Sequence, residues 1–124
     1  MEKIKSFTDL IAWKKGHQLV IAVYKVTNEF PKKEMFALTN QICRCAVSIT
    51  SNIAEGFSRK GIKEKIQFYY MSLGSVTELQ NQLLIARDIG YLSKEGFNNL
   101  AKQTIEVSKL LNGLIKSLKK TVSN

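Results

Sequence analysis

The sequence has few of the residues that interrupt helices or take part in catalysis. Its 124 residues include one proline, seven glycines, two cysteines and one histidine. So little proline favours long helices, and a single histidine leaves few ways to build a nucleophile–base pair. No run of about 18 apolar residues occurs, which excludes a membrane-spanning helix. The charged start, residues 1–5, lacks the apolar stretch of a secretory signal, so we expect a cytoplasmic protein without membrane contact.

The two cysteines, Cys43 and Cys45, are too close along a helix to pair with each other. Two residues turn a helix by about 200°, so the two thiols point in different directions. Their spacing also differs from the Cys-x-x-Cys spacing of zinc sites. We therefore expect reduced thiols that pack in the core, rather than a redox or metal centre. The sequence predicts no metal site and no cofactor.

Acidic residues are outnumbered. The chain has nineteen Lys and Arg against ten Asp and Glu, which gives a net charge of +9. Such an excess favours a polyanionic partner, and RNA or DNA before a membrane surface. Solubility alone is the competing explanation of the charge. With 44 % apolar residues, the length fits one domain, residues 1–124, with one core.

Apolar residues recur at helical spacing through four segments, and no segment alternates as a strand does. Thr8 suits the N-cap of the first segment, Pro31 follows its end, Gly90 ends the third, and Ser93 caps the fourth. Similar lengths and short links predict an all-α, antiparallel, up-down-up-down four-helix bundle. The first helix is apolar on all sides at residues 19–23, which indicates an oligomer. The expected helices cover residues 8–29, 33–57, 62–89 and 93–120.

An uncharged polar stripe runs beside the apolar stripe of the second helix, and a mixed stripe on the third resembles it. Surface helices usually carry Lys and Glu at such positions. The side chains in these stripes form hydrogen bonds but are not nucleophiles, so we expect an internal network or a subunit contact. A solvated face and a carboxylate-based active site are the alternatives. This polar seam comprises Gln41, Arg44, Ser48, Asn52, Glu55, Ser75, Glu78 and Gln82.

Gly56, at the end of the second helix, has two interpretations. A glycine at this position can adopt a left-handed conformation that caps the helix. Alternatively, it stays helical and lets another backbone approach closely. The sequence alone leaves both open.

The densest basic segment, residues 59–65, lies at the expected turn between the second and third helices. It holds four cations and one Glu beside a helix N-terminus, a setting that can bind phosphates. A solvated turn is the alternative. Phe68 or Tyr70 could stack on bases of a single strand, whereas Tyr69 has the spacing of a core residue. The predicted nucleic-acid contacts are Arg59, Lys60, Lys63 and Lys65.

Other signals of catalysis are absent from the sequence. His17 is expected to be a partly buried side chain that completes a packed face beside Trp13. No Glu stands three residues before it, so the di-iron spacing of helical bundles is missing. Phosphate-binding Gly-rich loops are also missing. We therefore expect no catalytic residues and no enzyme.

Several motifs form a combined signature between Phe7 and Leu118. They are Phe7-Thr8-Asp9-Leu10 with Trp13-Lys14-Lys15, Phe30-Pro31-Lys32-Lys33-Glu34 with Leu38 and Gln41, Ser48-Ile49 with Asn52-Ile53-Ala54-Glu55-Gly56, and Gly74-Ser75 with Glu78-Leu79 and Gln82-Leu83. In this combination the sequence resembles the bacterial four-helix-bundle proteins encoded in intervening sequences of 23S rRNA genes (S23-like proteins). The accessory variability proteins of diversity-generating retroelements are related to that family.

The resemblance implies an antiparallel bundle and a ring of five subunits, in a family largely without an established activity. The retroelement relatives are basic pentamers that bind nucleic acid and a reverse transcriptase. Five copies at +9 would carry about +45, enough to hold RNA or DNA through phosphates. We expect a non-enzymatic, homo-oligomeric scaffold that binds nucleic acid, with a protein such as a reverse transcriptase as a further partner. The alternative is a protein–protein interaction module whose charge serves solubility only.

Overall fold

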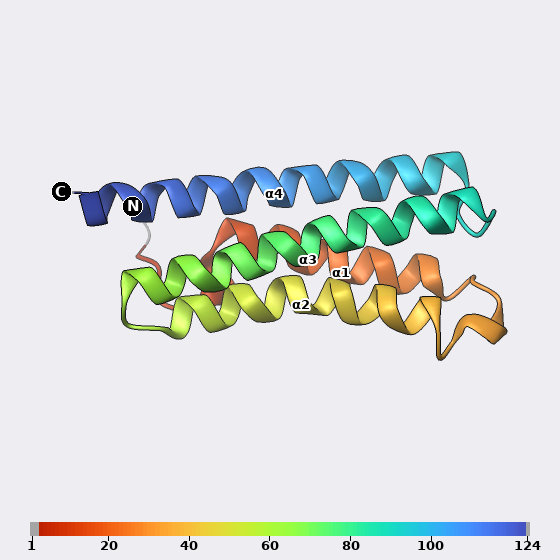
Figure 1. Cartoon of the computed structure of the whole chain (residues 1–124), viewed down its shortest axis with the longest axis horizontal. Helices are drawn as coiled ribbons and strands as arrows, with labels where there is room; N and C mark the ends of the chain where they lie inside the picture. Colours follow the sequence, from red (N-terminus) through yellow and green to blue (C-terminus); the bar gives the residue numbers. More distant parts are fainter. Residues whose placement is uncertain (1–2, 124) are drawn as a thin grey trace.

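The computed structural model describes residues 3–123, and this range folds into four α-helices and two single-turn 3₁₀ helices (Figure 1). The α-helices are α1 (Ile11–Thr27), α2 (Leu38–Ser58), α3 (Ile62–Asp88) and α4 (Lys94–Ser123). The 3₁₀ helices, η1 (Phe7–Asp9) and η2 (Lys32–Glu34), precede α1 and α2. Within the described range no strand forms, and no helix there combines the length and apolar character needed to cross a membrane.

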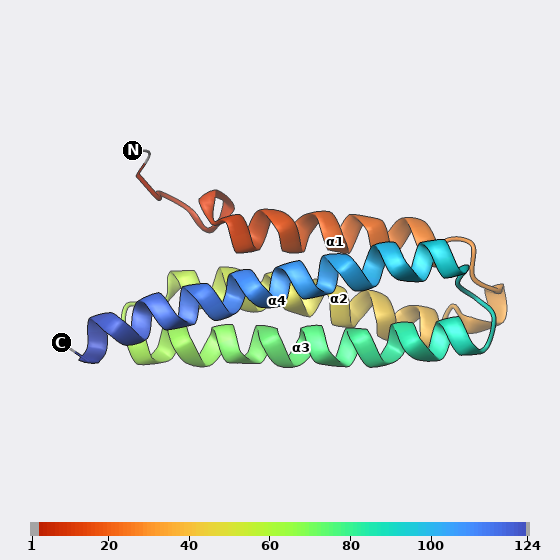
Figure 2. The ribbon, with the colours of Figure 1, turned by 90° about the horizontal axis from the view of Figure 1, so that it is seen from above.

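Each α-helix packs against its neighbours in sequence, and α1 also packs against α4 (Figures 1 and 2). Consecutive helices run in opposite directions. On α1 and α2, for example, Gly16 lies against Thr50, whereas Thr27 near the end of α1 contacts Cys43 early in α2. The predicted all-α, antiparallel four-helix bundle is thereby confirmed.

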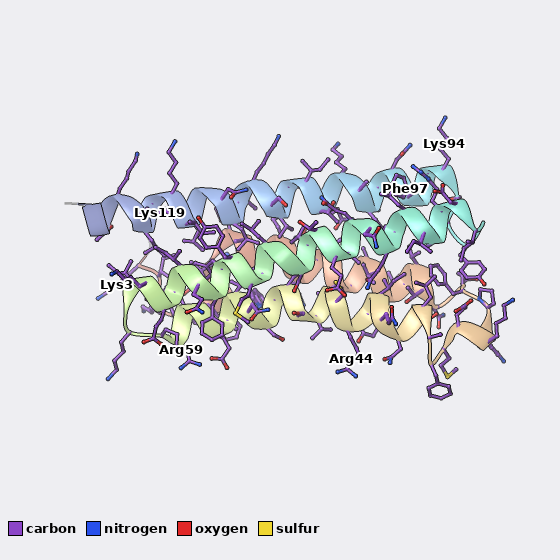
Figure 3. All side chains as sticks on the ribbon, in the orientation of Figure 1. Lys3, Arg44, Arg59, Lys94, Phe97 and Lys119 are labelled. Carbon is purple, nitrogen blue, oxygen red and sulfur yellow. The ribbon has the colours of Figure 1, made fainter. Side chains whose placement is uncertain are left out.

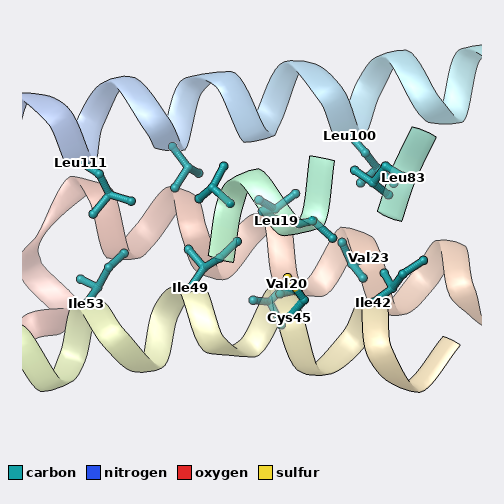
Figure 4. Close-up of a cluster of buried hydrophobic side chains, with 14 of the residues drawn as sticks. Leu19, Val20, Val23, Ile42, Cys45, Ile49, Ile53, Leu83, Leu100 and Leu111 are labelled. Atoms are coloured by element: carbon teal, nitrogen blue, oxygen red, sulfur yellow. The ribbon is translucent and has the colours of Figure 1, made fainter. Parts of the chain in front are cut away.

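The apolar stripes of the four helices meet in a single buried cluster among the described residues (Figure 4). The stripe predicted on the second helix, Ile42, Ala46, Ile49 and Ile53, is fully buried. Burial of one Leu or Ile side chain contributes about 1.5–3 kcal/mol, so this cluster is the main source of stability. Members drawn from the other helices include Leu19, Val23, Leu83, Leu100 and Leu111.

The first helix begins later than the sequence predicted, because a separate turn precedes it. Thr8 is not the N-cap of the first helix: Leu10 holds that position in α1, without a side-chain cap, and Ser6 caps η1. The Ser6 Oγ accepts a hydrogen bond from the Thr8 N–H, and the Asp9 carboxylate accepts one from the Ser6 N–H. Leu10 is then extended, and this bend brings the ring of Phe7 against Trp13 at 5.5 Å between centroids. At its other end, α1 stops at Thr27 rather than residue 29.

The second helix also begins later than predicted, at Leu38 instead of residue 33. Glu34 is the reason. Its Oε2 accepts a hydrogen bond from the Tyr91 hydroxyl (2.8 Å), in the link between α3 and α4, and its Oε1 accepts one from the Leu38 N–H (3.4 Å). This anchoring ends η2, and the non-helical Ala37 (φ −125°, ψ −109°) separates it from α2.

The glycine and serine signals of the other helix ends are borne out. Gly90 has φ +88°, follows the end of α3 closely, and is the one described residue that adopts a positive φ. The Ser93 hydroxyl accepts a hydrogen bond from the Gly96 N–H at the start of α4 (3.0 Å). Gly56 stays helical and buried, and a Cβ there would lie 2.7 Å from Cε1 of Tyr69. The capping interpretation of Gly56 is therefore wrong. The glycine stays helical, as the alternative stated, but the atoms that approach it belong to the side chains of Tyr69 and Phe68 and not to a backbone.

Candidate nucleic-acid interface

Three segments that are far apart in the sequence meet at one end of the bundle, which we call the basic end. They are the N-terminal stretch 3–9, the α2–α3 turn with its flanks (55–65) and the end of α4 (116–120). Lys3, Arg59 and Lys119 mark these segments in Figure 3. Together the segments hold nine Lys and Arg against three Asp and Glu.

The four cations predicted to contact phosphates divide into two pairs with different surroundings. Arg59 forms an ion pair with Glu55 (3.2 Å) and lies over the ring of Phe68 (4.8 Å to its centroid). Lys65 donates a hydrogen bond to the Phe57 carbonyl (2.7 Å), which satisfies an acceptor at the end of α2.

Lys60 and Lys63, in contrast, are exposed. Neither forms an ion pair or a side-chain hydrogen bond within residues 3–123. These two lysines are therefore available to a ligand without the loss of an internal contact.

Tyr70 is an exposed aromatic side chain of the basic end, at 44 % exposure. Its hydroxyl accepts a hydrogen bond from Nζ of Lys119 (2.6 Å), which also lies 5.2 Å from the ring centroid. The nucleic-acid contacts predicted from the sequence did not include Lys119 or its neighbours Lys116 and Lys120, which the sequence indicated only as cations suited to a helix C-terminus. The up-down order of the helices was the available signal, since it places the end of the fourth helix beside the start of the third.

The inner part of the polar seam is a hydrogen-bonded bridge between α2 and α3. The hydroxyls of Ser48 and Ser75 are 2.8 Å apart, and Nδ2 of Asn52 donates to the carbonyl (2.9 Å) and hydroxyl (3.1 Å) of Ser48. Cys45 donates its thiol to the Ser75 carbonyl (3.1 Å). Burial, with a smaller contribution from Glu78, raises the pKa of this thiol to about 12, so it stays protonated and unreactive at neutral pH.

The outer part of the seam borders solvent. Gln41, Arg44 and Glu78 are exposed and line an open hollow of about 420 Å³. Gln82 is buried and donates to Oε1 of Glu78 (3.3 Å), whereas its own Oε1 has no hydrogen-bond partner among the described residues. Arg44 forms no ion pair in this range; Glu55 pairs with Arg59 instead.

Polar residues that the seam prediction missed lie deeper in the bundle. Ser72 is fully buried and donates to the Ile49 carbonyl (2.8 Å). Its position on the core stripe, four residues before Val76, was the signal that could have identified it. Thr104 is likewise fully buried and receives a hydrogen bond from Gln80 (3.1 Å).

The arrangement contains little that resembles catalytic chemistry. His17 is exposed, not partly buried as predicted, and stacks on Trp13 at 4.7 Å between ring centroids. It can remain at the surface because Trp13 covers one face of its ring. Among residues 3–123, no three His, Cys, Asp or Glu side chains are grouped as metal ligands would be.

The fold and the site define an antiparallel four-helix bundle with one strongly basic end. The chain belongs to the 23S rRNA-intervening sequence protein family, whose model matches residues 8–113. This confirms the family that the sequence motifs indicated.

A solved structure of the same fold comes from Bacteroides thetaiotaomicron VPI-5482. It is a protein of unknown function from the S23 ribosomal protein family, with a TM-score of 0.79 and 20 % identity. The match covers 86 % of the present chain and 96 % of the other. At this identity the likeness concerns the fold alone. Among curated proteins, none matches the sequence.

Proposed function

We propose that this protein is a non-enzymatic, homo-oligomeric scaffold of the cytoplasm that binds RNA or DNA at its basic end. The observation that supports the proposal best is the pair of exposed, unpaired lysines, Lys60 and Lys63, among nine cations gathered from three segments. Phosphates would neutralise this cluster and release counterions, which is the main source of nucleic-acid affinity.

Apolar surface on α1 supports self-association. Ile11 and Ile21 are 60 % and 44 % exposed in the single chain, which is unfavourable for large aliphatic side chains in water. A second copy of the chain would cover them. We propose a ring of five subunits, as the family resemblance implies.

A charge-matched pair of variants tests the nucleic-acid site. The variant Lys60→Gln/Lys63→Gln removes two cations from the basic end, and the control Lys32→Gln/Lys33→Gln removes two exposed lysines from the opposite end. Fluorescence anisotropy with a labelled oligonucleotide over a salt series gives the affinity and its salt dependence. The basic-end variant should lower the slope of log K against log salt by about 1.4, since each lost single-strand phosphate contact accounts for about 0.7. An equal loss of oligonucleotide affinity in both variants would show that the net charge of the protein, not this site, governs binding.

Light scattering tests the assembly. Five copies of the 14.0 kDa chain would have a mass of about 70 kDa. Ile21→Glu should lower the mass, whereas Lys102→Glu, an exposed change on α4, should not. A wild-type monomer would contradict the ring.

The runner-up function, a protein–protein interaction module, is supported by a different feature. Phe36 is 88 % exposed and Met35 is 52 % exposed in the link between α1 and α2. A protein partner, for example a reverse transcriptase, could bind such a surface. Salt distinguishes the two functions, because phosphate contacts weaken steeply with salt and an apolar interface does not.

A further inference from the structure

We infer that the basic end prefers single-stranded over duplex nucleic acid, and that one base of the strand stacks on Tyr70. This inference rests on the proposed nucleic-acid function. It adds the class of ligand and the residue that selects it.

Tyr70 has the placement of a stacking platform. The ring is nearly half exposed, and the hydrogen bond between its hydroxyl and Nζ of Lys119 holds it at the surface. A fixed aromatic ring loses little conformational freedom when a base binds to it. The nearby ammonium group of Lys119 supplies a positive charge where the phosphates of a bound strand would pass.

One cation of the turn, Lys63, lies on the same face of α3 as Tyr70. Lys63, Gln67 and Tyr70 are all exposed, and they follow one another in steps of four and three residues. The seven residues from Lys63 to Tyr70 span about 10 Å along the helix. One extended strand could therefore place a phosphate at Lys63 and a base on Tyr70.

A second ring at the basic end is already stacked. Arg59 lies over Phe68 at 4.8 Å from the ring centroid, and Phe68 is half-buried. The guanidinium plane of an arginine is itself a surface on which bases stack. The two aromatic–cation pairs, Arg59 with Phe68 and Lys119 with Tyr70, match the combination of stacking and charge found in single-strand binding proteins.

A duplex would not use these rings. Its bases are stacked on one another, so their faces are not accessible to Tyr70 unless a base leaves the helix at an energetic cost. Phosphate contacts alone would not distinguish single-stranded from duplex nucleic acid, apart from the difference in their charge density. The exposed ring is thus the feature that favours the single strand.

The experiment compares a labelled 12-nucleotide oligo(U) with a 12-base-pair duplex, by anisotropy at low salt, on three variants. Tyr70→Leu should weaken oligo(U) binding between about fivefold and about 140-fold, because stacking on an aromatic ring contributes about 1–3 kcal/mol per base. Tyr70→Phe keeps the ring and should stay within about threefold of wild type. Tyr24→Leu, an exposed tyrosine on α1, is the matched control.

The outcomes separate this inference from the function on which it rests. If wild type binds neither probe, the proposed function fails and the inference fails with it. If wild type binds both probes equally, or if Tyr70→Leu leaves oligo(U) affinity within twofold, the proposed function stands and the inference is wrong. If Tyr70→Phe lost as much oligo(U) affinity as Tyr70→Leu, the loss would come from the missing hydroxyl. That result would also contradict stacking of a base on the ring.

Discussion

Both ends of the bundle are formed by links between helices, but they differ in their balance of positive and negative residues. At the end opposite the basic end, segments 25–34 and 87–95 hold five Lys and Arg and four Asp and Glu. Glu34 there accepts two hydrogen bonds, and Arg87 pairs with Asp88 at 2.8 Å. The basic end holds nine cations against three acids, and Lys60 and Lys63 have no partner within the described chain.

This difference indicates which charges serve the fold. At the opposite end, the hydrogen bond from Tyr91 to Glu34 joins the two links between helices, so the charge of Glu34 has a structural role. Lys32 and Lys33 of that end are exposed and form no ion pair among the described residues, but nearby acids balance their charge. Unpaired like charges at the basic end repel one another and lower the stability of the folded chain. Because the bundle does not need them, we interpret them as residues for a ligand that supplies the missing negative charge.

The largest expected effect concerns the packing beneath the basic end. Gly56→Ala would place a Cβ 2.7 Å from the ring of Tyr69 and 3.0 Å from Cβ of Phe68, so the buried Tyr69 ring, or α3 with it, would have to shift. We expect a loss of about 1–3 kcal/mol in the free energy of unfolding, the usual cost of overpacking. Urea denaturation measures it.

Gly113→Ala is the control for that substitution. Gly113 lies in α4 with no atom within 4 Å of an added Cβ. Alanine there should stabilise the chain by about 0.5–1 kcal/mol through helix propensity. A similar response at both positions would show that the close approach at Gly56 has no energetic consequence.

The next effect distinguishes two lysines of the basic end. Lys65→Gln removes the charge-assisted bond to the Phe57 carbonyl and should cost about 1–2 kcal/mol of stability. Lys63→Gln removes an exposed, unpaired cation and should change stability by less than about 0.5 kcal/mol. Nucleic-acid affinity should follow the reverse order. If both variants lost stability equally, the division between structural and free cations would be wrong.

Much of the fold was predictable because its signals are local. Helical spacing of apolar residues in four segments predicted the bundle. Gly90 and Ser93 predicted the end of α3 and the start of α4 to within one residue. The late start of α2 was not predictable in this way. It depends on Glu34 bonding to Tyr91, 57 residues further along the chain, and no local pattern reports such a contact.

The candidate site was predictable only in part, because some of its contacts join residues that are far apart in the sequence. The turn cations 59–65 form a run in the sequence, so composition was enough to find them. Arg59 stands four residues after Glu55, so helical spacing could have indicated that ion pair. The hydrogen bond from Lys65 to the Phe57 carbonyl crosses the turn, and spacing does not determine it. The contribution of Lys119 depends on the topology of the whole bundle.

A smaller effect tests the opposite end. Tyr91→Phe removes the hydrogen bond to Glu34 and should lower the melting temperature, by less than Gly56→Ala does. That bond, with some burial, raises the pKa of Tyr91 above its ordinary value of 10.0. A raised pKa means that the stabilisation is fully present below pH 10 and is lost as the pH rises through the folded-state pKa. Melting curves of both proteins should therefore differ at pH 7 and converge above pH 10; no difference at pH 7 would contradict the proposed anchoring.

The smallest effect comes from an acid of the basic end itself. Asp9 accepts hydrogen bonds from the backbone N–H groups of Lys5 (2.9 Å) and Ser6 (3.1 Å), which lower its pKa below the ordinary 3.8. The stabilisation is thus complete above pH 3.8 and is lost as the pH falls through the folded-state pKa. Asp9→Asn should lower the melting temperature slightly at pH 7, and the difference should vanish in strong acid. The same variant removes one of three acids near nine cations, so it should bind an oligonucleotide slightly more tightly. Weaker binding together with unchanged melting would show that Asp9 serves the ligand rather than the fold, the reverse of the division drawn between the two ends.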